Sequence, residues 1–207
     1  MKERFRTIYK EQQWNTADSD ADTVSGPGSS VKYTAHLVSE LPQLIQKYGI
    51  TSILDAPSGD FNWMPLVLKQ VPQVTYQGGD IVPELIERLK QQHPQYTWWE
   101  MDVTNDPLPQ VDLMICRDCL MHLSLNDIRK FRQNFLDSGS KYLLTTHHAE
   151  PNNSDIESGG YRHISMYHTP FNMQPNSELE RVRDYIHPYA ERYMLLYSRE
   201  QIAQSQG

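Results

Sequence analysis

The feature that most limits the fold is an alternation of short apolar runs with amphipathic stretches. Strands are predicted at residues 50–55, 74–80, 96–102, 112–117 and 142–146. Helices are predicted at residues 31–48, 63–71, 83–92 and 125–137. Strands that read as continuous apolar runs and alternate with helices are typical of βαβ units, in which helices cover both faces of a parallel sheet. The sequence therefore predicts an α/β fold.

Two further segments flank this alternation. Residues 1–30 are polar but contain Phe5, Ile8, Tyr9 and Trp14, so we expect an arm that folds onto the domain and covers a ligand. A frayed terminus is the alternative. Residues 150–176 are predicted to form a long functional loop before a last strand at 192–197. The 207 residues show no repeat and no second domain, which suits a single domain over 1–207.

Composition argues against several classes of protein. The chain has 19 Lys and Arg against 26 Asp and Glu, a net charge of −7 that disfavours a dedicated nucleic-acid binder. No apolar stretch approaches the roughly 18 residues of a membrane span, and the start lacks the apolar core of a signal peptide. Cys116 and Cys119 have no second cysteine pair for zinc, so we expect reduced packing residues, with a redox pair as the alternative. We expect a cytoplasmic protein and make no prediction of its oligomeric state.

Polar residues stand at the predicted carboxyl ends of the strands, where ligands of an open parallel sheet bind. One Asp at a strand end is explained by helix capping or a turn, but four of the five ends carry one. The strand-end residues are Asp55, Gly79-Asp80, Met101-Asp102-Val103, Arg117-Asp118 and His147-His148.

These positions suit a cofactor that contains a nucleoside. Gly59, which has no Cβ, permits close approach of the backbone to a ligand. Asp80 stands where a carboxylate accepts both ribose hydroxyls, and Asp102 with the backbone amide of Val103 suits an adenine. Neither G-x-G-x-x-G nor G-x-x-x-x-G-K-[ST] occurs, which argues against a dinucleotide or a nucleoside triphosphate.

Several motifs occur together, in order, from the arm to the late loop. They are GPGSS at 26–30, SILDAPSGDFNWM at 52–64, GDIV at 79–82, CRDCLMHLS at 116–124, SGSKYLLTT at 138–146 and PFN at 170–172. The set resembles class I S-adenosylmethionine (SAM)-dependent methyltransferases, and within them a bacterial subgroup with the first motif L-D-x-P-C-G-D-F-N-W-M. The chain departs from the wider family because only the middle glycine, Gly59, is present, between Pro57 and Phe61. Ser58 stands where the subgroup has Cys.

The resemblance implies a Rossmann-like three-layer α/β/α sandwich with a mostly parallel seven-stranded sheet and an antiparallel last strand. It also implies SAM as cofactor, with the methionine part, the ribose and the adenine held in turn along the strand ends. The residues expected to bind it are Asp55, Ala56, Pro57, Ser58, Gly59, Asp60, Trp63, Asp80, Ile81, Asp102, Val103, Arg117 and Asp118. Asp118 is expected to bind the ammonium of SAM, and Arg117 to pair with Asp118 or with an anionic acceptor.

Histidines are the candidates for a general base, because imidazole titrates near neutral pH. His122 stands one turn beyond Asp118, and packing beside the cofactor is its alternative role. His147 and His148 are rival bases. A metal site built from these two with His163, His168 and Asp118 matches no standard ligand spacing, so no metal is expected.

The sequence thus predicts a methyltransferase. We expect it to O-methylate a small polar molecule such as a sugar or a nucleotide-linked compound. The alternatives are an RNA or protein methyltransferase and a non-catalytic SAM-binding protein.

Overall fold

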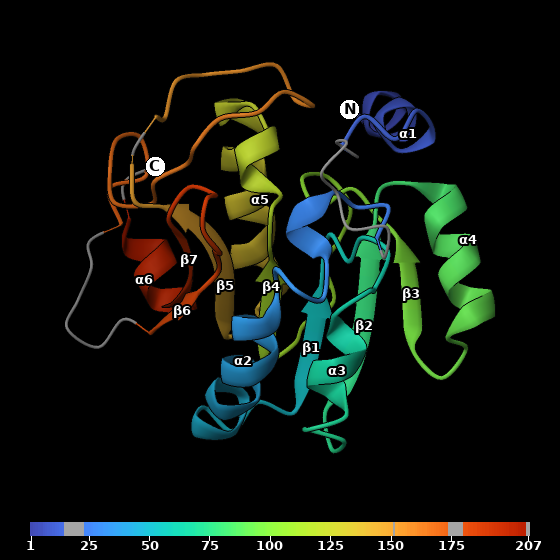
Figure 1. The fold of residues 1–207 in the computed structure, drawn as a ribbon. Helices are drawn as coiled ribbons and strands as arrows, with labels where there is room; N and C mark the ends of the chain where they lie inside the picture. Colours follow the sequence, from blue (N-terminus) through green and yellow to red (C-terminus); the bar gives the residue numbers. More distant parts are fainter. Residues whose placement is uncertain (15–22, 151, 174–179, 206–207) are drawn as a thin grey trace.

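A seven-stranded sheet with the order β3-β2-β1-β4-β5-β7-β6 forms the centre of the molecule (Figure 1). The computed structural model describes residues 1–14, 23–150, 152–173 and 180–205. β1 to β5 pair in parallel, whereas β7 runs antiparallel to both β5 and β6. The mostly parallel sheet with an antiparallel last strand is therefore confirmed. The strands are β1 (Ser52–Asp55), β2 (Thr75–Asp80), β3 (Thr97–Glu100), β4 (Leu113–Cys116), β5 (Tyr142–His148), β6 (Arg181–Arg183) and β7 (Arg192–Ser198).

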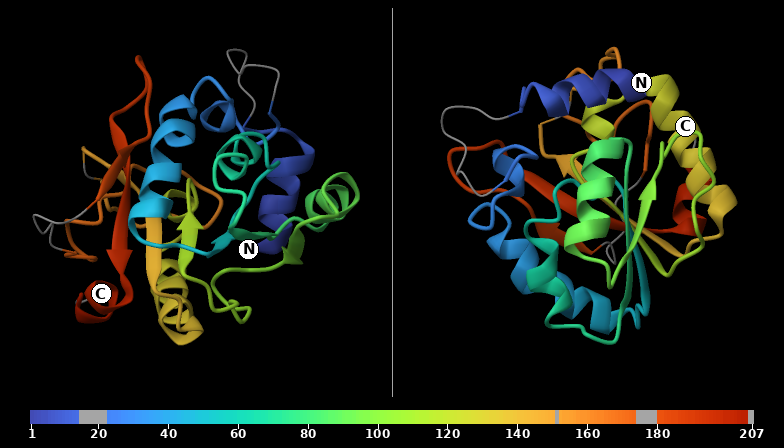
Figure 2. Two further views of the ribbon diagram at one scale, coloured as in Figure 1. Left: turned by 90° about the horizontal axis from the view of Figure 1, so that it is seen from below. Right: turned by 90° about the vertical axis from the view of Figure 1, so that its right-hand side faces the viewer.

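Helices cover both faces of this sheet, which confirms the three-layer arrangement. The helices are α1 (Lys2–Lys10), α2 (Ala35–Lys47), α3 (Met64–Leu68), α4 (Pro83–Gln92), α5 (Leu125–Ser138) and α6 (Arg199–Gln204). Figure 2 shows α2 and α3 on one face and α5 and α6 on the other. α4 packs beside β2 and β3. None of the helices among the described residues is both long enough and apolar enough to cross a bilayer.

Local signals explain where two of the helices begin and end. α4 has the predicted bounds because Pro83 takes its first position, where the missing N–H is not needed. α5 begins after Ser124, whose hydroxyl accepts a hydrogen bond from the N–H of Asp127. It ends at Ser138, and the next residue, Gly139, has a φ of 74° that favours glycine. These boundaries depend on neighbouring residues alone, and the sequence therefore predicted them within one residue.

Other boundaries differ from the prediction. β5 does not stop at residue 146 but includes His147 and His148, because antiparallel pairing with β7 continues its ladder of hydrogen bonds to that point. β3 stops at Glu100, so Asp102 lies in the following turn. The helix predicted at 31–48 begins only at Ala35. α1, α6 and the three-residue strand β6 were not predicted as elements.

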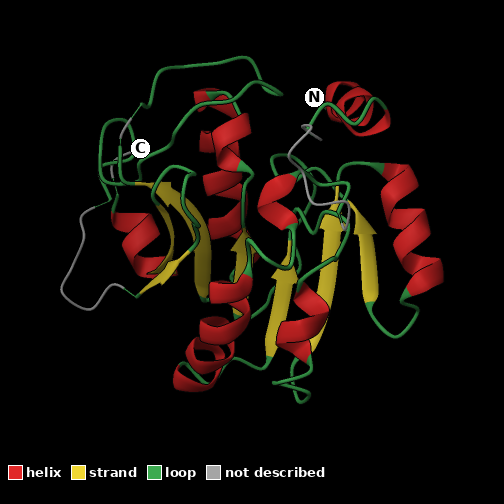
Figure 3. Ribbon diagram, in the orientation of Figure 1, coloured by secondary structure: helices red, strands yellow, loops and turns green. Residues whose placement is uncertain are grey.

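α1 lies at the end of the sheet to which the parallel strands point (Figure 3). Phe5 and Ile8 on this helix are buried. Arg6 and Lys10 form ion pairs with Glu84 of α4 at 2.5 and 2.9 Å. The loop after β5 runs along the same end of the molecule (Figures 1 and 3). Of the loop predicted at 150–176, residues 151 and 174–176 lie outside the described residues.

Candidate functional site

A cavity lies at the carboxyl ends of β1, β2 and β4. The arm contributes Met1, Phe5, Tyr9 and Trp14 to its wall. Most residues that the sequence predicted for the site line it as well. These are Asp55, Pro57, Ser58, Gly59, Trp63, Asp80, Ile81, Asp102, Val103, Arg117, Asp118 and His122. Four predicted residues are not part of the wall: Ala56, Asp60, His147 and His148.

The turn after β1 brings backbone close to the arm and to β2. Gly59 has a φ of 54°, and a Cβ at this position would lie 2.8 Å from the hydroxyl of Ser25. Its N–H donates to Oδ2 of Asp80 at 3.3 Å. Glycine is needed here because both the backbone conformation and the approach of the arm exclude a side chain.

Asp60 binds the arm rather than facing the cavity. Its Oδ2 accepts hydrogen bonds from the hydroxyl of Thr23 at 2.8 Å and from the N–H of Val24 at 2.7 Å. Its own N–H donates to the hydroxyl of Ser25 at 2.9 Å. The sequence assigned Asp60 to the cofactor, whereas its observed contacts join the first-motif turn to the arm.

Two buried carboxylates, Asp55 and Asp80, line the cavity. The hydroxyl of Tyr76 donates to Oδ2 of Asp55 at 2.9 Å, and the N–H of Val82 donates to Oδ1 of Asp80 at 3.0 Å. Burial raises the pKa of Asp55 to about 7 and that of Asp80 to about 6, although these hydrogen bonds act in the opposite direction. Neither carboxylate forms an ion pair with a described residue. The cavity therefore presents two carboxylates without an ion-pair partner among the described residues, although Arg117 is close enough to Asp55 to act to lower its pKa.

Beyond these carboxylates, four charged side chains form a buried network at the ends of β4 and β7. Arg117 donates through Nε and Nη2 to the two carboxylate oxygens of Asp184, at 3.0 and 2.8 Å. Arg192 lies 2.8 Å from Oδ1 of Asp118 and donates to its Oδ2 at 3.0 Å. Arg117 also donates to the carbonyl of Gly28 in the arm at 2.6 Å. Two positive and two negative charges balance within this four-charge network.

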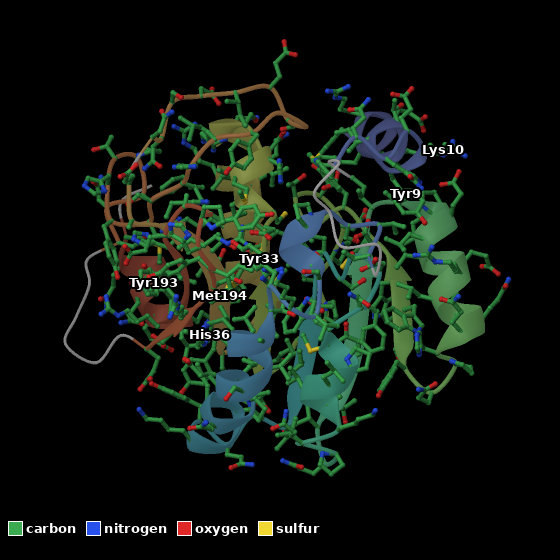
Figure 4. All side chains as sticks on the ribbon, viewed as in Figure 1. Tyr9, Lys10, Tyr33, His36, Tyr193 and Met194 are labelled. Carbon is green, nitrogen blue, oxygen red and sulfur yellow. The ribbon has the colours of Figure 1, made fainter. Side chains whose placement is uncertain are left out.

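The network fixes the conformation of Asp118. Its φ is 50°, a left-handed value that Asp adopts more readily than most residues. Its N–H donates to the hydroxyl of Thr146 at 2.9 Å. Burial acts to raise the pKa of the Asp118 carboxyl, but Arg192 and Arg117 outweigh it and the pKa is lowered. Tyr33 packs 4.9 Å from the Arg192 guanidinium and lies near β7 in Figure 4.

Solved structures share this arrangement of strands and helices. Magnesium protoporphyrin IX methyltransferase from Synechocystis PCC 6803, crystallised with SAM, has a TM-score of 0.63 and 12% identity over 96% of each chain. The 1,6-didemethyltoxoflavin-N1-methyltransferase of Burkholderia thailandensis has a TM-score of 0.59 and 13% identity over 95% of this chain and 86% of that one. No family model matches the chain, and no curated protein matches its sequence.

The chain has the fold of SAM-dependent methyltransferases. Human N-acetylserotonin methyltransferase, solved with SAM, also has this fold, with a TM-score of 0.55 and 13% identity over 95% of this chain and 66% of that one. At these identities the likeness concerns the fold. The bacterial subgroup suggested by the motifs stays a prediction.

Asp102 lies in the turn after β3 of this methyltransferase fold, with both carboxylate oxygens engaged. Oδ1 accepts from the N–H and the hydroxyl of Thr104 at 2.9 and 2.7 Å, and Oδ2 accepts from the amide of Asn105 at 2.9 Å. Both lone pairs of Oδ1 are therefore engaged, whereas Oδ2 retains one. Asp102 therefore combines a turn-forming role with acceptor capacity toward the cavity it lines.

His122 ends a short 3-10 turn (Leu120–His122) and lines the cavity. Its Nδ1 donates to the carbonyl of Gly160 at 2.7 Å, which leaves Nε2 as the acceptor of a neutral ring. Burial lowers the pKa of His122, although the Gly160 carbonyl and Asp118 act to raise it. A neutral imidazole with one fixed tautomer has the properties of a general base.

His147 and His148 face the loop after β5 instead. The ring Nδ1 of His147 accepts from the N–H of Met166 at 3.1 Å, and that of His148 accepts from the N–H of Ile164 at 3.2 Å. Burial lowers the pKa of each to about 4. Both imidazoles are therefore neutral, and each accepts a hydrogen bond that holds the loop in place. The described residues hold no cluster of three or more His, Cys, Asp or Glu side chains arranged as metal ligands.

Two members of the four-charge network, Asp184 and Arg192, were missed from the sequence. Arg192 opens an apolar strand, and a charged residue at that place was an available signal. Asp184 lies between β6 and β7 in a polar stretch without a recognisable pattern. Each is more than 65 residues from Arg117 or Asp118, so only the tertiary structure brings them together.

Proposed function

We propose that the chain is a SAM-dependent methyltransferase that methylates a hydroxyl group of a small molecule. The observation that carries the proposal is the pair of buried carboxylates, Asp55 and Asp80, which form no ion pair with a described residue and lie in a strand-end cavity of this fold. SAM carries an ammonium group, a sulfonium and two ribose hydroxyls, which are the partners that such carboxylates lack. These two carboxylates therefore fit SAM.

Each part of SAM has a proposed partner. Asp80 accepts the ribose hydroxyls, and Ile81 packs beside them. Asp102 and the backbone amide of Val103 bind the adenine, as expected from the resemblance. The backbone of residues 55–60, including Ala56, Pro57, Ser58 and Gly59, holds the methionine part, with Trp63 next to it. Asp60 contributes through its place in this turn and through its bonds to the arm.

The geometry favours a change in one assignment. Asp118 is already neutralised by Arg192, and Arg117 by Asp184. We therefore assign the ammonium of SAM to Asp55, which has no such partner, and a positioning role to Asp118 and Arg117. Of the arm over 1–30, residues 15–22 lie outside the described residues; the described parts, 1–14 and 23–30, supply cavity wall, which supports the arm's proposed role as a cover.

His122 is the proposed general base. When bound, SAM supplies an electrophilic methyl group on a sulfonium sulfur. In the transfer, the acceptor oxygen would bond to that methyl carbon as the carbon–sulfur bond breaks, and the electron pair would remain on sulfur. Nε2 of His122 takes the hydroxyl proton, while the Gly160 carbonyl keeps the proton on Nδ1 in place. His147 and His148 are the less favoured bases, because backbone N–H groups already occupy their acceptor nitrogens.

Several expectations stay predictions: the cytoplasmic location, a single domain, and a sugar or nucleotide-linked acceptor. The experiment that tests the proposal is calorimetry with S-adenosylhomocysteine, followed by transfer from radiolabelled SAM to a set of small hydroxyl compounds. We expect one site and a raised Tm. Absence of binding would refute SAM as the cofactor. Transfer to RNA or protein alone would refute a small molecule as the acceptor. Binding without transfer to any acceptor favours the non-catalytic alternative.

The base is tested with matched variants. We expect His122→Ala to lower turnover about 10²–10⁴-fold while His147→Ala and His148→Ala keep it, provided that the latter two stay folded. Their melting temperatures serve as the control for folding. A loss of turnover confined to a folded His147→Ala or His148→Ala variant would reverse the assignment.

A further inference from the structure

Aromatic rings form a row beside the end of the cavity where β4 stops. The centroid of Trp14 lies 5.4 Å from that of His122, which lies 5.7 Å from Tyr161, which lies 5.9 Å from His163. Trp14 and His122 line the cavity, and Tyr161 and His163 extend the row along the loop after β5. These four side chains, from the arm, the 3-10 turn and the loop, are called the ring row below.

Tyr161 is the unusual member of the ring row because 58% of it is exposed. Two other large aromatic side chains of the described chain are exposed, and each has a partner that accounts for its position. Trp99 donates to Gln77 on the neighbouring strand, and Tyr189 packs edge-on against Tyr33. Tyr161 contacts rings of the site itself. An exposed ring next to a cavity is a common feature of ligand sites.

The two guanidinium groups of the four-charge network beside the ring row are already paired. Each guanidinium of the four-charge network is bound to a carboxylate, and Arg192 donates through Nε to the backbone carbonyl of Asp184 at 2.7 Å as well. Arg162 is 3% exposed, and its Nη1 donates to the carbonyl of Leu123, whereas its buried Nε and Nη2 have no hydrogen-bond partner among the described residues. Arg4 lies over Gly159. Neither Arg162 nor Arg4 lines the cavity. Arg117 is the one guanidinium among the described residues that line the cavity, and Asp184 already pairs with it, so a phosphate or carboxylate on the acceptor finds no free guanidinium in the cavity wall.

The proton acceptor of the site adds a second requirement. Nε2 of His122 is the free nitrogen of a neutral ring, and burial lowers the pKa of that ring. A weak base removes a proton most readily from an acidic hydroxyl. A phenol, with a pKa of about 10, meets this requirement far better than a sugar hydroxyl.

We propose that the acceptor is an uncharged, planar aromatic compound with a ring hydroxyl, which stacks against the ring row and presents its hydroxyl to His122. This inference rests on the proposed methyltransferase function and specifies its substrate class. It replaces the sugar or nucleotide-linked acceptor expected from the sequence. Stacking selects a flat ring, and the pairing of Arg117 in the cavity wall with Asp184 selects one without phosphate or carboxylate.

The test compares matched acceptors on the full chain, after calorimetry has established that S-adenosylhomocysteine binds. The set contains hydroxylated benzenes, indoles and quinolines, the saturated cyclic alcohol of each size, hexoses, a nucleoside diphosphate hexose, and phenols that carry a phosphate elsewhere on the ring. We expect methyl transfer to uncharged phenols at kcat/KM values at least tenfold above those of the saturated and phosphorylated analogues. Failure to bind S-adenosylhomocysteine would refute the methyltransferase itself. Binding with equal or greater transfer to saturated or phosphorylated compounds, or with no transfer to any phenol, refutes the aromatic acceptor alone.

Variants at Tyr161 then test the ring row, because this residue does not line the cofactor cavity. Tyr161→Ala is expected to raise KM for the phenol about two- to tenfold, the effect of one aromatic contact, with S-adenosylhomocysteine affinity unchanged. Tyr161→Phe keeps the ring and should restore the KM. Trp99→Ala removes an exposed ring outside the site and serves as the control. An unchanged KM in Tyr161→Ala, or an equal rise in Trp99→Ala, would contradict the proposal.

Discussion

Replacement of Asp80 by Asn should stabilise the ligand-free protein and weaken cofactor binding. The substitution keeps the shape of the side chain and removes its charge. Asp80 is buried, and its two oxygens accept hydrogen bonds from the N–H groups of Val82 and Gly59. It forms no ion pair with any described residue, so the buried charge has no cation nearby to offset its loss of hydration.

The size of the stability effect follows from the pKa of Asp80. Burial raises this pKa from 3.8 to about 6, so ionisation at pH 7 costs the folded state about 3 kcal/mol. The amide oxygen of Asn retains the bond from the N–H of Val82, whereas the N–H of Gly59, at 3.3 Å, loses its acceptor at a cost of about 1 kcal/mol. We expect Asp80→Asn to be more stable by about 2 kcal/mol at pH 7.

The pH dependence has a defined sign. A raised folded pKa means that the native state binds the proton more tightly than the unfolded state. Wild-type stability attributable to Asp80 therefore falls as pH rises from 3.8 to about 6. The advantage of Asp80→Asn should disappear at pH 4. Urea denaturation followed by circular dichroism at pH 4, 5 and 7 measures this difference.

Cofactor affinity should change in the opposite direction. A carboxylate accepts from both ribose hydroxyls, whereas Asn offers one acceptor oxygen. Loss of a hydrogen bond to a charged group costs about 1–3 kcal/mol, and every 1.4 kcal/mol is tenfold in Kd. Calorimetry with S-adenosylhomocysteine should therefore show binding weakened by about tenfold to a hundredfold.

Asp112 supplies the matched control at the amino end of the sheet. It accepts hydrogen bonds from the N–H and hydroxyl of Thr51, at 2.8 and 2.6 Å, and pairs with Lys141 at 2.7 Å. Burial acts to raise its pKa, but these partners hold it well below its usual range. Asp112→Asn should destabilise the protein by about 1–2 kcal/mol and leave affinity unchanged. A destabilised Asp80→Asn with wild-type affinity would refute the reasoning.

Three further outcomes are expected. His122→Ala should lower kcat about 10²–10⁴-fold with cofactor affinity retained, as measured with the identified acceptor. Full activity of this variant would refute His122 as the general base. SAM affinity should fall as pH drops through about 7 and then about 6, because protonated Asp55 loses its attraction for the ammonium group and protonated Asp80 is a poorer acceptor for the ribose hydroxyls. A flat profile in calorimetry from pH 5 to 8 would contradict this. Gly78→Ala should destabilise the fold by about 1–3 kcal/mol in urea, because the new Cβ overlaps the ring of Trp98; a neutral change would refute the overlap.

The strand ends illustrate how much of the site was present in the sequence. Asp55, Asp80 and Asp118 follow or end short apolar runs, and parallel strands gather their carboxyl ends at one edge of a sheet. Once the alternation of strands and helices was recognised, the convergence of these residues on one cavity followed. α4 and α5 were bounded correctly because Pro83, Ser124 and the glycine after α5 act on the backbone locally.

Contacts between segments that are distant in the sequence could not be predicted from local sequence patterns. The pairing of Arg192 with Asp118 and the contact of Trp14 with His122 join segments that no local pattern relates. β6 is three residues long, too short for a periodic signal, and exists because β7 offers it an edge.

His147 and His148 of β5 also differ in what the sequence predicted for them and what the tertiary structure determined. The sequence placed His147 and His148 at a strand end and made them candidate bases, which is all that local pattern supports. Their burial under the following loop depends on two long-range contacts, the ladder with β7 and the backbone of residues 164–166. The sequence by itself determined which chemical groups stand at the strand ends. The tertiary structure decided which of them remain free to act, because a buried polar group must satisfy its hydrogen bonds with whatever the fold brings beside it.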